Sequence, residues 1–261
     1  MRENYPTLFV SHGAPTLAID EGPTAKFLED LGGKLGHPKA VLCVSAHWET
    51  EQPVVGGAPE PTTIHDFCGF TEELYEITYA AKGSTTLANR VEDILVQRGI
   101  KCGADRARGL DHGAWVPLSL MFPEADIAVT QLSIQPNRSP AEHLALGRAL
   151  APLGEEGVLV MGSGGAVHNL EHFHPGVSDV PEWALKFDDW LADVVERGDA
   201  DELVTRWTSD AAGAMAHPRD EHLLPLPVAF GAAGDRARGR VLNRGFENGA
   251  LSMAAYLFQP S

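Results

Sequence analysis

The sequence has few cysteines, and they are widely spaced. Its 261 residues include three, Cys43, Cys68 and Cys102, and none belongs to a CxxC pair. This spacing argues against a disulfide framework and against a zinc site built on thiolates. Cys43 stands within an apolar stretch and is most simply a small core residue. A metal site in this chain would therefore use nitrogen or oxygen ligands.

Basic residues and long apolar runs are also scarce. Twenty Lys and Arg against 36 Asp and Glu leave a formal charge of −16. A surface that acidic repels nucleic-acid phosphates and anionic lipid. No apolar run is long enough to cross a bilayer, and residues 1–10 lack the hydrophobic core of a secretory signal. We expect a cytoplasmic protein, a monomer or small homo-oligomer, with no nucleic-acid or membrane partner.

Three familiar loop motifs are missing as well. The glycine-rich segment at 162–165 lacks the GK[ST] ending of a phosphate-binding loop and the spacing of a dinucleotide fingerprint. It is not a GxSxG nucleophile elbow either, because residue 161 is Met. We interpret it as a turn after a strand, with glycines that admit a bulky neighbour.

Buried strands and amphipathic helices alternate along the chain. Apolar residues predict strands at 7–10, 40–48, 127–134 and 158–161, and helical patterns occur at 24–35, 84–99, 139–153 and 181–197. Residues 52–63 are rich in Pro and Gly and predict a loop, and Asn248-Gly249 predicts a late hairpin. The pattern indicates one domain over residues 1–261. Its predicted fold is α/β, a three-layer α/β/α sandwich with a mixed, mostly parallel central sheet.

Five histidines have small or apolar neighbours in the sequence. They are His12, His47, His112, His168 and His222. The first four stand at predicted strand ends or in glycine-bounded loops, and open α/β sheets bind ligands at the carboxyl ends of their strands. A single histidine of this kind is more often a hydrogen-bonded structural residue. As a group, they predict a site for iron(II), zinc or manganese, or for proton transfer.

Other polar or aromatic segments are weaker candidates for metal ligands or for substrate-binding residues. His172 and His174 follow His168 in a polar stretch, where histidines more often belong to a solvated face. The aromatic-rich segment at 64–70 is suited to lining a pocket. Arg106, Arg108 and Arg219 are candidates for binding a substrate carboxylate, although surface salt bridges are the commoner fate of such residues.

Six short motifs occur in a recognisable order. They are Ser-His-Gly-Ala-Pro at 11–15, Ser-Ala-His-Trp at 45–48, Ile-His-Asp-Phe-Cys-Gly-Phe at 64–70, Asp-His-Gly-Ala-Trp at 111–115, Gly-Ser-Gly-Gly-Ala-Val-His-Asn-Leu at 162–170 and Glu-His-Leu-Leu-Pro-Leu at 221–226. Together they resemble the class III extradiol ring-cleaving dioxygenases, in the branch of DOPA 4,5-dioxygenase. The resemblance extends from about residue 6 to the C-terminus.

The resemblance implies a mononuclear non-haem metal site. His12, His47 and His222 would be the ligands, with iron(II) needed for ring cleavage and zinc(II) also able to occupy the site. His168 matches a residue that serves as a fourth ligand or as an acid and base. His112 matches a residue that contacts substrate or dioxygen from outside the ligand set.

The third ligand has two candidates. Another branch of the family uses a glutamate at this place, and Glu221 and His222 are neighbours here. Adjacent side chains on a regular element usually point apart. We favour His222, because it extends the all-histidine pattern, and expect Glu221 to orient it.

The predicted function is an enzyme that cleaves a small catechol in extradiol fashion and incorporates both atoms of O2. His168 would serve as base and later acid, and His112 would stabilise developing negative charge on oxygen. One alternative is a zinc-dependent hydrolase acting on a small amide or ester. The other is a metal-binding relative without catalytic activity.

Overall fold

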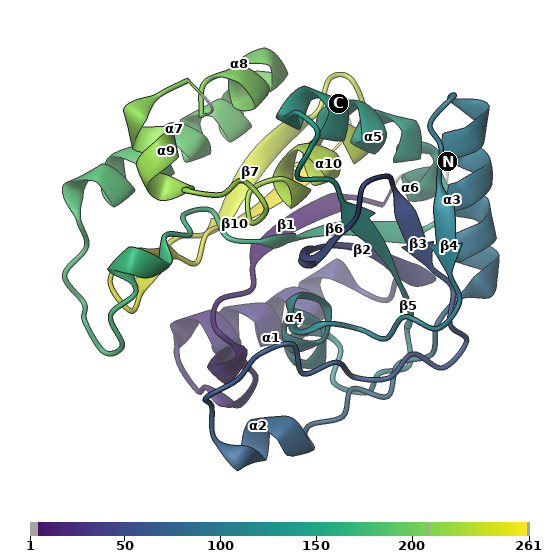
Figure 1. The fold of residues 1–261 in the computed structure, drawn as a ribbon, viewed down its shortest axis with the longest axis horizontal. Coiled ribbons are helices and arrows are strands. Elements are labelled where there is room, and N and C mark those ends of the chain that lie inside the picture. The colour runs from purple at the N-terminus through teal and green to yellow at the C-terminus, as the bar shows by residue number, and fades with distance from the viewer. Residues whose placement is uncertain (1–4, 208, 260–261) are drawn as a thin grey trace.

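A mixed eight-stranded sheet forms the middle layer of the computed structural model, which describes residues 5–207 and 209–259 (Figure 1). The strand order is β4-β3-β5-β2-β6-β1-β10-β7. Four parallel strands make up its centre: β5 (Ala128–Ile134), β2 (Ala40–Glu49), β6 (Val158–Gly164) and β1 (Thr7–Ser11). The edges are β3 (Val54–Gly56) with β4 (Gly103–Asp105), and β10 (Ala255–Gln259) with β7 (Arg238–Asn243), and they join the centre in antiparallel fashion.

Both faces of the sheet are covered because its strands carry apolar residues on both sides. In β2, Val41 and Cys43 pack into one core cluster, while Leu42 and Val44 pack into the other. On the first side lie α1 (Pro23–Leu35) and α4 (His112–Met121). On the second side lie α3 (Thr85–Gln97), α5 (Pro140–Leu150), α7 (Glu182–Arg197) and α10 (Pro225–Ala232) (Figure 1). The predicted three-layer α/β/α fold is confirmed.

The remaining elements are short. They comprise α2 (Glu72–Glu76), α6 (Pro152–Glu155), α8 (Ala200–Thr205), α9 (Ala211–Ala216), and the 3-10 turns Pro15–Ile19 and Leu170–His172. The hairpin predicted at Asn248-Gly249 is confirmed as β8 (Phe246–Glu247) with β9 (Leu251–Ser252). Both turn residues have positive φ, 51° and 91°, as a tight hairpin turn requires.

Three boundary predictions are wrong, and one of them, the end of β6, is described with the site below. The segment 52–63 is not all loop, because β3 forms within it by pairing with β4 and β5. The helix predicted at 139–153 ends at Leu150, and Pro152 starts the separate α6. Within the described part of the chain, no helix combines the length and apolar character that a bilayer crossing requires.

Candidate metal centre

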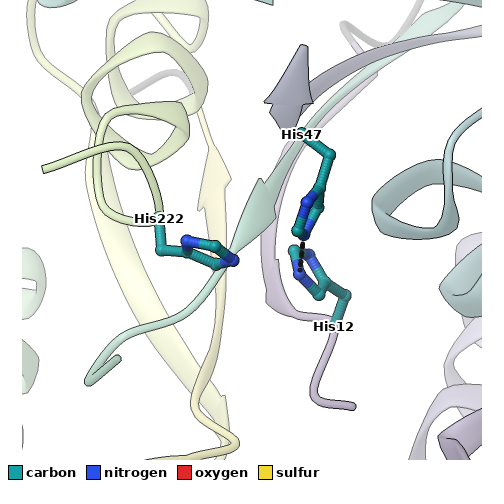
Figure 2. Close-up of side chains that lie close together, drawn as sticks. All are labelled: His12, His47 and His222. Atoms are coloured by element: carbon teal, nitrogen blue, oxygen red, sulfur yellow. Dashed lines mark hydrogen bonds between the residues drawn. The ribbon is translucent and has the colours of Figure 1, made fainter. Parts of the chain in front are cut away.

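The sheet brings three of the predicted histidines together at the carboxyl ends of its central strands. His12 directly follows β1, His47 lies near the end of β2, and His168 comes four residues after β6. Because these strands are parallel and β6 lies between the other two, their carboxyl ends are adjacent. His222 reaches the same place from the turn before α10, and Figure 2 shows it pointing toward His12 and His47.

The three rings of His12, His47 and His222 meet closely. One ring nitrogen from each lies within 4.8 Å of the others. Nε2 of His12 and Nε2 of His47 are 3.0 Å apart, the contact drawn dashed in Figure 2. His12 and His222 are 2% and 6% exposed, so two of the three rings are almost entirely withdrawn from water.

A hydrogen-bond chain determines which nitrogen of His12 is free. The Ser163 hydroxyl donates a hydrogen bond to the carbonyl of Gly113, so it accepts one from the Nδ1–H of His12, 3.0 Å away. Nε2 of a neutral His12 then carries a lone pair. The same orientation recurs in the other rings: Nδ1 of His222 is 3.0 Å from Oε1 of Glu221, and Nδ1 of His47 is 3.5 Å from Oδ2 of Asp66.

This arrangement fits a metal cation. Histidines that bind metals in proteins present one nitrogen to the metal, while the other donates to a carboxylate or a similar acceptor. With every Nδ1 assigned to such an acceptor, the Nε2 lone pairs of His12 and His47 face each other at 3.0 Å. Lone pairs at that distance repel unless a proton or a cation lies between them.

The electrostatics keep the rings neutral. Burial, assisted by the neighbouring rings, lowers the pKa of His12 and of His222 well below the usual value. Burial and the nearby His112 lower the pKa of His47 to about 3. A metal ligand must be deprotonated, so all three rings are in the ligand form at neutral pH.

Asp66 connects two of the histidines, and the sequence did not single it out. Its Oδ1 is 3.0 Å from Nδ1 of His112 and accepts from the backbone N–H of the same residue at 2.9 Å. Its other oxygen faces His47. Partial burial raises the pKa of Asp66, but the hydrogen bonds from His112 outweigh it and lower the pKa to about 2. The group is therefore a carboxylate that can hold both rings in place.

His112 lies in a helix rather than in the glycine-bounded loop that the sequence predicted. It is the first residue of α4, whose N-cap is Asp111. Asp111 is fully buried, and its carboxylate accepts from Ser45 at 2.7 Å and from Gln131 at 2.8 Å. The helix has no polar face in its middle, so it lacks the helical periodicity that marked the other helices.

His168 packs flat against His222. The two ring centroids are 3.4 Å apart and the planes differ by 8°. Burial, and then the nearby rings of His47 and His112, lower the pKa of His168 to about 4. No hydrogen bond joins this ring to another described residue, and the ring lines the cavity described below. It is thus a neutral imidazole with nitrogens available to a ligand.

The glycines of β6 let the segment of His222 approach. A Cβ on Gly164 would lie 2.0 Å from the carbonyl oxygen of His222, and a Cβ on Gly162 would lie 2.4 Å from that of Pro225. The same His222 carbonyl accepts from the backbone N–H of Gly165 at 2.9 Å. The expectation that these glycines admit a close neighbour is confirmed, and that neighbour is backbone. The turn predicted at 162–165 is wrong, because β6 continues through Gly164.

The other histidines are placed elsewhere. His172 and His174 have ring centroids 6.5 Å apart, and His172 packs on Trp183. Neither belongs to a group of described side chains that could hold a metal. His217 is buried, and its Nε2 is 3.0 Å from the carbonyl of Ala166.

A cavity of about 550 Å³ opens beside the cluster. Its lining residues are His12, Gly13, Ala14, Pro15, Ala46, His47, Glu49, Asp66, Phe67, Phe70, His112, His168, Leu170, Phe173, Arg219, Glu221, His222 and Leu251. The expectation that the segment 64–70 lines a pocket is confirmed. Of the three arginine candidates, Arg106 pairs with Glu92 and Arg108 with Asp111, and neither lines the cavity, whereas Arg219 does.

Neutral imidazoles at the ends of parallel strands, beside a cavity, are typical of metal-dependent α/β enzymes. Residues 6–259 match the family model described as the catalytic LigB subunit of aromatic ring-opening dioxygenase. A 4,5-DOPA dioxygenase extradiol of Beta vulgaris is 46% identical, covering 97% of this chain and 96% of the relative. One of Escherichia coli is 36% identical, covering 95% and 92%.

A solved structure agrees with these sequence relatives. The crystal structure of an uncharacterised protein from Escherichia coli K12 matches with a TM-score of 0.81 at 32% identity, covering 97% of this chain and 99% of that one. The chain belongs to the LigB family, and it is an extradiol ring-cleaving dioxygenase.

Proposed function

We propose that the protein is an iron(II)-dependent dioxygenase that cleaves a small catechol beside its diol, with His12, His47 and His222 as the metal ligands. The convergence of three neutral imidazoles, each with its Nδ1 beside an acceptor, carries the proposal. Bound iron(II) would supply Lewis acidity toward the diol and a change of redox state for dioxygen, which zinc cannot provide.

Glu221 is assigned the orienting role. Its Oε1 is 3.0 Å from Nδ1 of His222, and its Oε2 is 3.4 Å from Nε of Arg219. Oε1 thus contacts His222, and Oε2 is at ion-pair distance from Arg219 without a hydrogen bond among the described residues, whereas His222 directs its ring at His12 and His47. This division of contacts favours His222 over Glu221 as the third ligand.

His168 is assigned the proton transfers. A neutral imidazole can accept the proton of a catechol hydroxyl, and the resulting imidazolium can return it to an oxygen later in the reaction. His168 is neutral at pH 7 because burial lowers its pKa to about 4. Its place against His222 puts the ring beside the proposed ligand set.

His112 is assigned a hydrogen bond to an oxygen atom of substrate or dioxygen that gains negative charge. Its Nδ1 faces the Asp66 carboxylate at 3.0 Å, and the ring lines the cavity. An N–H of this ring would donate that hydrogen bond. A donor held in advance stabilises such an oxygen without rearrangement.

The substrate is proposed to be a catechol with a side chain, such as DOPA. The cavity offers an apolar wall of Phe67, Phe70, Phe173 and Leu251, which suits an aromatic ring. Relatives from three plants and from Escherichia coli carry the name 4,5-DOPA dioxygenase extradiol. The product would be a muconic semialdehyde. We also propose a cytoplasmic location and a monomer or small homo-oligomer, as the sequence predicts.

Oxygen uptake after anaerobic loading with iron(II) tests the proposal. We expect uptake with L-DOPA or a simpler catechol, and none from the same protein loaded with zinc(II). Ester or amide hydrolysis by the zinc form without oxygen uptake would favour the hydrolase instead. Iron binding with no uptake across a panel of catechols would favour a catalytically silent relative.

A further inference from the structure

One ion pair on the cavity wall contacts no histidine ring directly. Three carboxylates line the cavity, and two of them, Asp66 and Glu221, contact histidine rings. The third, Glu49, contacts Arg219 instead, and Nη2 of Arg219 lies 2.9 Å and 3.1 Å from its two oxygens. Among the described residues that line the cavity, Arg219 is the one arginine or lysine.

The sequence puts Glu49 close to the proposed metal site. It comes two residues after His47 at the end of β2, and both side chains line the cavity, whereas Trp48 between them is buried. Two residues of a strand span roughly 6.6 Å. Glu49 therefore lies on the same cavity wall as His47, farther along β2, where the far end of a substrate bound at the histidine cluster could reach it.

The pair keeps hydrogen-bonding capacity for a ligand. Both oxygens of Glu49 accept from a single nitrogen of Arg219, so each retains a lone pair. Nε of Arg219 faces Glu221, while Nη1 has no ion-pair or hydrogen-bond partner within the described residues. The side chains are 39% and 67% exposed, and an exposed pair of this kind contributes little to stability.

We infer that Glu49 and Arg219 form a subsite that recognises the head group of an α-amino acid. Glu49 accepts from the substrate ammonium and Arg219 donates to its carboxylate, so that a zwitterion is preferred over catechols with one charge or none. This rests on the proposed function, because the diol must lie at the histidine cluster for the head group to reach the pair.

The test compares four catechols on the iron(II)-loaded protein: L-DOPA, dopamine with only the ammonium, dihydrocaffeate with only the carboxylate, and methylcatechol with neither. Each kcat/KM is divided by that for methylcatechol. In the wild type, the ratio for L-DOPA should exceed those of the two singly charged catechols by about 10-fold or more, because hydrogen bonds between charged groups are strong.

The variants separate the two contacts. Glu49→Gln should lower the ratios for L-DOPA and dopamine by about 10- to 100-fold and spare that for dihydrocaffeate. Arg219→Met should lower the ratios for L-DOPA and dihydrocaffeate and spare that for dopamine. The matched control is Arg106→Met. This variant breaks the 2.8 Å ion pair between Arg106 and Glu92, which does not line the cavity, and should leave all three ratios as in the wild type.

Binding without turnover gives a second measurement. Dissociation constants of the four catechols, measured anaerobically by calorimetry on zinc(II)-loaded protein, should follow the same order. Ratios near one in the wild type, or equal losses for all charged catechols in both variants, would overturn the subsite while leaving ring cleavage intact. Absence of oxygen uptake with every catechol would instead contradict the proposed function.

Discussion

Two groups of histidines in this chain differ in what brings them together. His168, His172 and His174 are close in sequence, yet the last two turn away from any candidate metal site among the described residues. His12, His47 and His222 come from distant parts of the chain, and their nitrogens meet within 4.8 Å. Strand topology, rather than local spacing, brings His12 and His47 together, because parallel strands place their last residues at the same end of the sheet, and His222 joins them from the turn before α10.

Removing a proposed ligand should have the largest effect. His47→Ala leaves two of the three proposed ligands. We expect iron(II) affinity and turnover to fall by more than about 100-fold, because the loss of a residue that only supports a ligand already costs up to that much. Metal content after dialysis, measured by mass spectrometry, checks this. His172→Ala is the matched control and should bind iron like the wild type; equal metal content in both variants would refute the assignment.

Replacing His168 should separate chemistry from metal binding. His168→Phe keeps a flat ring against His222 but removes the proton acceptor, so turnover should fall by about 100- to 10,000-fold with iron content unchanged. Oxygen uptake and metal analysis on the same sample measure both. His174→Phe serves as control. Loss of iron in His168→Phe would make the residue a ligand, and wild-type turnover would remove it from the mechanism.

Asp66 should have a smaller effect, because it acts through other residues. Asp66→Asn keeps the size of the side chain but weakens the contacts to His47 and His112, so iron affinity should fall by about 10- to 100-fold. A competition titration with a chelator measures the change. Asp126→Asn is the matched control, because that carboxylate pairs with the exposed ring of His37. The same affinity in the two variants would argue against the bridging role.

Acid should destabilise the metal-free protein gradually. Burial lowers the pKa of His47 to about 3, of His168 to about 4 and of His217 to about 3, from 6.5. The unfolded chain therefore takes up these protons at a higher pH than the folded one. Stability is complete above about pH 6.5 and declines below it, by up to about 1.4 kcal/mol per pH unit for each histidine.

Urea unfolding with a chelator present, at pH 7 and pH 5, measures this decline. Equal free energies of unfolding at the two pH values would show that the histidines are not buried as neutral groups.

The sequence predicted the parts of the site that lie on strand ends. The strands of His12 and His47 are apolar on both faces and end in small residues, a pattern that local sequence reveals. It did not single out Asp66, whose partner His112 is 46 residues away, because loop closure is not encoded in spacing. The sequence did not predict helix α4 for another reason. The helix is buried along most of its length, so it has no polar stripe to reveal a helical period.

Strand β3 shows the same limit. Its three residues become a strand only by pairing with β4 and β5, while Pro and Gly around it predict a loop. Tertiary pairing decides such short segments.

Anomalous diffraction at the iron edge, from crystals loaded anaerobically with iron(II), tests the shared metal centre most directly. We predict one strong peak at bonding distance from Nε2 of His12, His47 and His222. A peak at His172 and His174, or no peak among the three rings of Figure 2, would contradict the account.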